Sequence, residues 1–96
     1  MKAVLIVHNT ALEPDVAEIL EAAGISCYTK FPNILGKGAL SEPHLKIEVW
    51  PETNCGTLVV TESDKAAKLM DHVRHARQKL GSEGIKAFVW QIDDMT

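Results

Sequence analysis

Residues 2–8 read Lys-Ala-Val-Leu-Ile-Val-His, an apolar run that is typical of a buried strand. Residues 85–92, Ile-Lys-Ala-Phe-Val-Trp-Gln-Ile, form a second run of this kind near the other end of the chain. In both runs, the residues that would point to opposite faces of a sheet are largely apolar. The sequence therefore predicts two strands that carry apolar side chains on both faces.

Two helices are expected between these runs. The first would begin at residues 13–15, Glu-Pro-Asp, because proline and acidic side chains suit a first helical turn, and it would end at Gly24. The second would begin at residues 61–64, where Thr and Asp have the spacing of a capping box, and end at the glycines of residues 81–84. Its apolar stripe consists of Ala66, Leu69, Met70, Val73, Ala76 and Leu80.

The middle of the chain carries the remaining strands. Residues 25–35 are expected to form the second strand, residues 36–43 a loop, and residues 45–50 a third strand. Residues 51–54 then predict a turn or bulge, after which the chain continues in extended form. This order predicts a single α+β domain over residues 1–96 with the ferredoxin-like βαββαβ arrangement, an antiparallel four-stranded sheet with both helices on one face.

The composition limits the classes of function. With 96 residues, 46% of them hydrophobic, and a net charge of −3, the chain is expected to form one globular domain without general affinity for nucleic acid. No apolar stretch is long enough to cross a bilayer, and no signal-peptide pattern is present. Cys27 and Cys55 have neither metal-binding nor disulfide-framework spacing, so a reduced, cytoplasmic protein is expected.

The sheet is expected to have one uncovered face. Two helices can cover only one face of four strands, so apolar residues of both terminal strands would remain exposed on the other face. An exposed apolar patch of this kind usually marks an interface. The chain is therefore expected to form an oligomer.

The segment before the last strand carries a resemblance to a known family. Residues 79–89 read Lys-Leu-Gly-Ser-Glu-Gly-Ile-Lys-Ala-Phe-Val, which is similar to the loop that cradles nucleotide phosphates in PII signalling proteins. Gly24, Thr29 and the Gly-Lys-Gly of residues 36–38 resemble the second strand of that family and the base of its signalling loop. The resemblance covers nearly the whole chain, and the wider relatives include CutA-like proteins. It implies a homotrimer with ATP or ADP in clefts between subunits.

The resemblance also implies site residues. Thr29 would lie near the base of a nucleotide, and a second group would lie near its phosphates: Gly36, Lys37, Gly38, Gly81, Gly84 and Lys86. Glycines let backbone N–H groups converge on an anion, but the same glycines would also serve as a helix stop and turn. The signalling loop, from Gly36 to His44, is shorter than in the family, and residues 93–96 lack the family's arginines. The effector is therefore left as an adenine nucleotide or another anion.

The sequence thus predicts a non-catalytic regulatory protein that senses a small molecule in intersubunit clefts and signals to a partner protein through residues 36–44. No catalytic triad order, nucleophile elbow or P-loop pattern is present. Two alternatives stay open, a CutA-like metal-binding trimer and an ACT-like module that binds amino acids as a dimer. The identities of the effector and the partner also stay open.

Histidines and cysteines carry the metal-binding alternative. His8 and His44 could each approach Cys27 or Cys55, and such ligands suit a soft metal. Because sequence spacing alone brings no pair together, no metal ligand is predicted. A further group shares one turn of the second helix and is expected on a solvated face: Asp71, His72 and His75.

Overall fold

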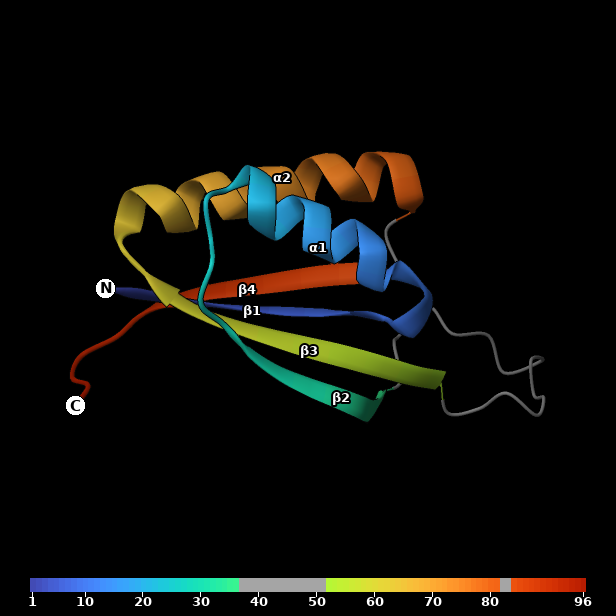
Figure 1. The fold of residues 1–96 in the computed structure, drawn as a ribbon, viewed down its shortest axis with the longest axis horizontal. Coiled ribbons are helices and arrows are strands. Elements are labelled where there is room, and N and C mark those ends of the chain that lie inside the picture. Colours follow the sequence, from blue (N-terminus) through green and yellow to red (C-terminus); the bar gives the residue numbers. More distant parts are fainter. Residues whose placement is uncertain (37–51, 82–83) are drawn as a thin grey trace.

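The computed structural model describes residues 1–36, 52–81 and 84–96. In this part of the chain, a four-stranded sheet lies beneath two helices that cover the same face (Figure 1). The elements are β1 (Lys2–Asn9), the 3-10 helix η1 (Thr10–Leu12), α1 (Glu13–Ala22), β2 (Thr29–Gly36), β3 (Glu52–Thr61), α2 (Ser63–Leu80) and β4 (Ile85–Gln91). No helix among the described residues is both long and apolar enough to cross a membrane.

The strands have the order β2-β3-β1-β4, and every neighbouring pair is antiparallel. This confirms the predicted ferredoxin-like arrangement. β1 and β2 run in one direction, and β3 and β4 run in the other. Asn9, Gly36, Glu52 and Ile85 therefore lie at the same end of the sheet, which is called the loop end below (right in Figure 1).

The core lies between the sheet and the helices. Val4 and Ile6 of the central strand β1 are fully buried beneath this helical layer. The helices contribute Val16, Ile19, Leu20, Ala66, Leu69 and Val73. Each set recurs at the helical period, so the stripe predicted for the second helix faces the sheet, except for Leu80, which is 41% exposed. The face of the sheet beneath the helices is called the covered face.

The two helices differ in how well their ends were predicted. Gly24 ends α1 with a φ of 76°, as expected of a left-handed helix stop, and its carbonyl accepts a hydrogen bond from Lys65 Nζ at 3.1 Å. The capping box predicted at residues 61–64 is wrong, because Thr61 belongs to β3 and pairs with Lys2. Residue 62 is the N-cap of α2, and its side chain makes no capping hydrogen bond.

The strand boundaries also differ from the prediction. β2 begins at Thr29 instead of residue 25, and its register shifts between Phe31 and Ile34 around Asn33, which has a φ of 58°. The turn predicted at residues 51–54 is wrong for residues 52–54, which continue β3. Strand pairing keeps them extended, since all three pair with β2 and Asn54 pairs with β1 as well. The strand predicted at residues 45–50 lies outside the described residues.

The face opposite the helices, called the open face, is apolar as predicted. Antiparallel register places Leu5 beside Phe88 and Ala3 beside Trp90 on this face. Phe88 is 49% exposed and Trp90 is 46% exposed. Other apolar residues of the face are Val7, Phe31, Leu58 and Val60. The predicted assembly that would bury this face stays a prediction.

Candidate functional site

The glycines singled out from the sequence gather at the loop end of the sheet. Gly36 closes β2 opposite Glu52, and the carbonyl of Gly84 accepts a hydrogen bond from the backbone N–H of Asn9 at 2.8 Å. Gly81 caps α2 immediately before this point. Lys37 and Gly38, together with the rest of the expected signalling loop to His44, lie outside the described residues.

Gly81 and Gly84 each have a structural reason to be glycine. Gly81 has a φ of 98°, which side chains rarely adopt, and it ends the helix with a hydrogen bond to the carbonyl of Arg77. A Cβ on Gly84 would lie 3.0 Å from the Leu12 side chain. The backbone conformation therefore favours glycine at residue 81, and close packing against Leu12 favours it at residue 84, whether or not an anion binds there.

Thr29 and Lys86 lie far apart within one chain. Thr29 is in the edge strand β2 and pairs with Leu58, whereas Lys86 is in the opposite edge strand β4 and pairs with Val7. Three strand spacings separate them, roughly 14 Å. Both positions alternate onto the open face, and both residues are exposed. One chain does not bring them to a common ligand, so a site that contains both needs a second chain.

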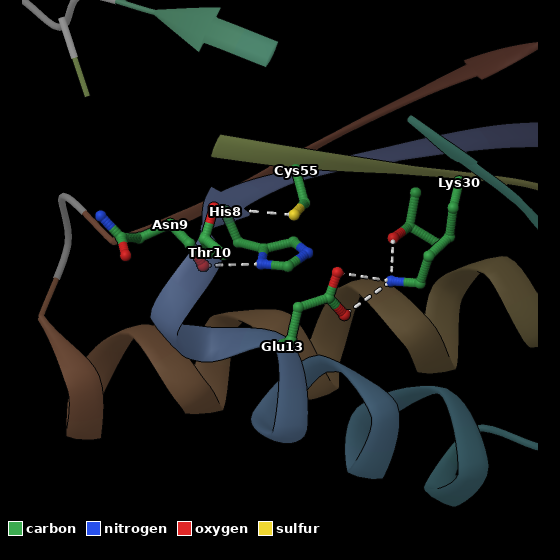
Figure 2. Close-up of polar contacts among 7 residues, drawn as sticks. His8, Asn9, Thr10, Glu13, Lys30 and Cys55 are labelled. Carbon is green, nitrogen blue, oxygen red and sulfur yellow. Dashed lines mark hydrogen bonds and ion pairs between the residues drawn. The ribbon is translucent and has the colours of Figure 1, made fainter. Parts of the chain in front are cut away.

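A different cluster, which the sequence indicated only in part, lies on the covered face near the loop end. His8 of β1 and Cys55 of β3 are paired in register, and Glu13 approaches them from the first turn of α1 (Figure 2). A nitrogen of His8, the sulfur of Cys55 and a carboxylate oxygen of Glu13 all lie within 4.8 Å of one another. Lys30 Nζ contacts both Glu13 oxygens, at 2.7 and 3.0 Å.

The charges of this cluster are set by its neighbours. The hydrogen bond from Lys30 lowers the pKa of the Glu13 carboxyl below its ordinary value of 4.5. Burial opposes this shift, and a hydrogen bond from Cys55 and the positive charge of Lys30 reinforce it. Glu13 is therefore a carboxylate over the whole neutral range.

His8 is the unusual member of the cluster. Its side chain is 1% exposed, and its Nε2 is a buried atom with no hydrogen-bond partner among the described residues. A buried polar atom without a partner costs about 1–3 kcal/mol. Its Nδ1 lies 2.9 Å from the carbonyl oxygen of Asn9, and a carbonyl can only accept, so Nδ1 carries the proton. In the neutral imidazole, Nε2 then presents a lone pair to the cluster.

The sequence named His8 and Cys55 among four possible histidine and cysteine partners, but it missed Glu13 and Lys30. The structure separates the two cysteines, since Cys27 is exposed and Cys55 is buried. The sequence could have indicated His8, because a histidine at the end of a buried apolar strand needs polar partners in the core. Glu13 could not be found this way, because its acidic side chain is equally expected at a helix start.

The second-helix group is only partly solvated. Asp71 is exposed and forms an ion pair with Arg74 at 2.8 Å. His72 and His75 instead line a groove of about 230 Å³ between α1 and α2, together with Asp15 and Glu18. His75 is exposed, as Asp71 is, so the predicted solvated face is confirmed for both. His72 is half-buried, because α1 packs beside this side of α2.

Comparison with known proteins identifies the family. The family model for nitrogen regulatory protein P-II matches residues 1–96, the whole chain. The chain belongs to this family. The P-II match confirms the resemblance seen in the sequence. No curated protein sequence matches the chain.

Solved structures of PII-like proteins share the fold of this P-II family member. CPII from Thiomonas intermedia K12, bound to ADP, AMP and bicarbonate, matches with a TM-score of 0.72 at 20% identity, over 95% of this chain and 84% of CPII. The apo form of CPII matches with a TM-score of 0.71 at 16% identity, over 95% and 87% of the two chains. A putative PII-like signalling protein from Thermus thermophilus matches with a TM-score of 0.66 at 20% identity, over 95% and 85%.

Proposed function

We propose that this P-II family member is a non-catalytic regulatory protein that binds a small anionic effector in clefts between the subunits of a homotrimer. An adenine nucleotide is the first candidate, and bicarbonate is the second. The observation that carries the proposal is the placement of Thr29 and Lys86 on opposite edges of an apolar face that no helix covers among the described residues.

The open face supports the assembly. In one chain, Phe31, Phe88 and Trp90 each remain more than 40% exposed. Clustered aromatic side chains of this kind are typical of the buried centre of an interface. An assembly that covers this face would set the β2 edge of one subunit against the β4 edge of another. Thr29 and Lys86 of different subunits could then line the same cleft.

The residues at the loop end support the proposed ligand site and the proposed signalling role. Gly36, Gly81 and Gly84 lie at this end, and Lys86 is the second residue of β4 beside it. Backbone N–H groups and a lysine ammonium are suitable partners for phosphate or bicarbonate. Because β2 ends at Gly36 here, we assign the signalling role to residues 36–44, with Lys37 and Gly38 contributing to the ligand site.

Calorimetry combined with light scattering tests the proposal. We expect a particle of three times the chain mass of 10.5 kDa, and binding heat with ADP, ATP, AMP or bicarbonate. The variant Lys86→Ala should bind the active ligand about 10- to 100-fold more weakly, as expected for loss of a charged hydrogen bond. The matched variant Lys68→Ala, on the exposed side of α2, should bind normally. A monomer, or a trimer that binds none of the four ligands, would contradict the proposal.

A further inference from the structure

The cluster of His8, Glu13 and Cys55 on the covered face has the composition of a metal site. Its nitrogen, sulfur and oxygen donor atoms lie within 4.8 Å of one another and come from three elements, β1, α1 and β3. Two donors on one tetrahedral Zn²⁺ lie roughly 3.6 Å apart, given Zn–N and Zn–S distances of about 2.1 and 2.3 Å. The three side chains therefore need only small rotamer adjustments to share an ion.

The orientation of His8 is the strongest argument. Its Nδ1–H donates to the carbonyl oxygen of Asn9, which fixes the ring and leaves the lone pair on Nε2 (Figure 2). Metal-binding histidines are usually held in this way, by a hydrogen bond from the ring nitrogen that does not ligate. Nε2 is buried and has no partner in the part of the chain that the structure describes. A metal ion would supply that partner.

The neighbours of Cys55 also suit a ligand. Thr10 Oγ1 donates to the carbonyl of Thr53 at 3.1 Å and lies 3.8 Å from Cys55 Sγ. Either atom can be the donor in this second contact, and Cys55 also hydrogen-bonds to the Glu13 carboxylate. Cys55 is 5% exposed, so its sulfur is shielded from other thiols. The thiol proton is the group that a metal would replace.

We propose that His8 Nε2, Cys55 Sγ and the Glu13 carboxylate bind a divalent transition-metal ion of the zinc type. Imidazole, thiolate and carboxylate together match Zn²⁺ and its close analogue Co²⁺ in ligand preference. Three protein ligands leave a fourth position for water, unlike a closed structural site with four protein ligands. Glu13 forms the solvent side of the site, since its side chain is 35% exposed.

Lys30 links metal binding at this site to the neighbouring strand β2. In the metal-free protein its ammonium group neutralises Glu13, with contacts to both carboxylate oxygens. An arriving cation has to share or displace that partner, and the Cys55 thiol has to release its proton. Binding therefore forms metal–nitrogen, metal–sulfur and metal–oxygen bonds and releases about one proton per ion. Metal occupancy would act on β2 through Lys30, in the strand that ends at Gly36.

This site is distinct from the proposed effector site. None of its ligands belongs to the glycine and lysine group at the loop end. His8 and Cys55 lie on the covered face, and Glu13 faces them from α1. Metal binding can therefore be present while effector binding fails, and the reverse. The two proposals are tested by different ligands and different variants.

Cobalt titration of the full chain is the direct experiment. Metal-free protein is titrated with Co²⁺, and we expect a thiolate-to-cobalt charge-transfer absorption that saturates near one ion per chain and disappears when Zn²⁺ is added. Calorimetry with Zn²⁺ in two buffers of different ionisation enthalpy should report about one proton released. A folded protein with no thiolate band, or with no proton release, would overturn the proposal.

Paired variants identify the ligands. Cys55→Ser should abolish the thiolate band, while Cys27→Ser, which changes the exposed cysteine, should keep it. Glu13→Gln should weaken binding by more than about tenfold, while His75→Ala, in the groove between the helices, should have no effect. Lys30→Met should tighten binding, because it removes the competing cation. A band that survives Cys55→Ser, or weaker binding in Lys30→Met, would overturn the site. Circular dichroism confirms that each variant is folded.

Discussion

The two faces of the sheet have similar apolar sequences and opposite environments. On the covered face, Val4 and Ile6 are 0% exposed, whereas Phe88 and Trp90 on the open face are nearly half exposed. Val4 and Ile6 come from the central strand β1, and Phe88 and Trp90 come from its neighbour β4, in which Ile85 on the covered face is 1% exposed. Hydrophobicity of the strands therefore does not decide which face becomes the core. The two helices decide it, since they can cover only one face, and the other stays uncovered within one chain.

The faces also differ in their polar residues. The covered face buries His8 and Thr57, next to the Glu13–Lys30 ion pair. The open face places its lysine, Lys86, where the side chain is exposed. Burying a polar group costs free energy unless the group is hydrogen-bonded. A buried group that is hydrogen-bonded is held in one orientation. Chemistry that depends on a fixed lone pair is therefore expected on the covered face, and chemistry that depends on a second subunit on the open face.

The largest effect is expected from a cavity beneath the helices. Leu69→Ala removes a side chain that is 0% exposed and should lower the free energy of unfolding by about 2–5 kcal/mol. Urea denaturation measures this change. Met95→Ala, in the exposed C-terminal tail, should change it by less than about 0.5 kcal/mol. If both variants lowered the free energy of unfolding equally, side chains beneath the helices would contribute no more to stability than exposed ones.

The second-largest effect is expected on the open face, where a substitution should change the oligomeric state and leave the fold of each chain unchanged. Trp90→Glu places a charge in the proposed interface, and the oligomer should dissociate to monomers because a buried unpaired charge is strongly unfavourable. Light scattering measures the mass, and circular dichroism should show an unchanged fold. Trp90→Phe is the matched control and should keep the assembly. If both variants keep the mass of the unaltered protein, the open face is not the interface.

A smaller effect should follow the pH dependence of the Glu13–Lys30 pair. Because the folded-state pKa of Glu13 is below its ordinary value of 4.5, folding favours the carboxylate. The stabilisation is fully present above pH 4.5 and is lost as the pH falls below it, through the folded-state pKa. We expect Glu13→Gln to remove this part of the acid dependence, worth at most about 1 kcal/mol for a partly exposed pair.

Thermal unfolding between about pH 3 and pH 6 measures this contribution. Asp71→Asn is the control, because it removes the solvated ion pair with Arg74 and should leave the profile nearly unchanged. If the stability of Glu13→Gln changed with pH in the same way as that of the unaltered protein, the Glu13–Lys30 ion pair would contribute nothing to the acid dependence.

Local patterns predicted most of the fold. The apolar runs of the terminal strands, the helical stripes and the Gly24 stop all lie where expected, because each depends on residues close in sequence. The errors occur where pairing overrides local preference. Residues 52–54 have turn-like composition but stay extended because they pair with β2, and Asn54 pairs with β1 as well. The apparent capping box lost Thr61 to β3 for the same reason.

The candidate sites were predictable to different degrees. The family resemblance supplied the loop-end glycines, and the structure adds that Thr29 and Lys86 cannot meet within one chain. For the metal cluster, the sequence offered four pairings of two histidines with two cysteines. Register selects His8 and Cys55, which are far apart in the chain but adjacent in the sheet.

The sequence by itself determined the order of the elements, the family, and the presence of apolar residues on both faces of the central strands. These properties depend on short-range periodicity, which any reader of the chain can recover. Only the tertiary structure decided which face the helices cover, which cysteine is buried, and that Glu13 and Lys30 close around His8 and Cys55. Those outcomes depend on strand register and helix packing, where residues far apart in sequence compete for the same neighbours.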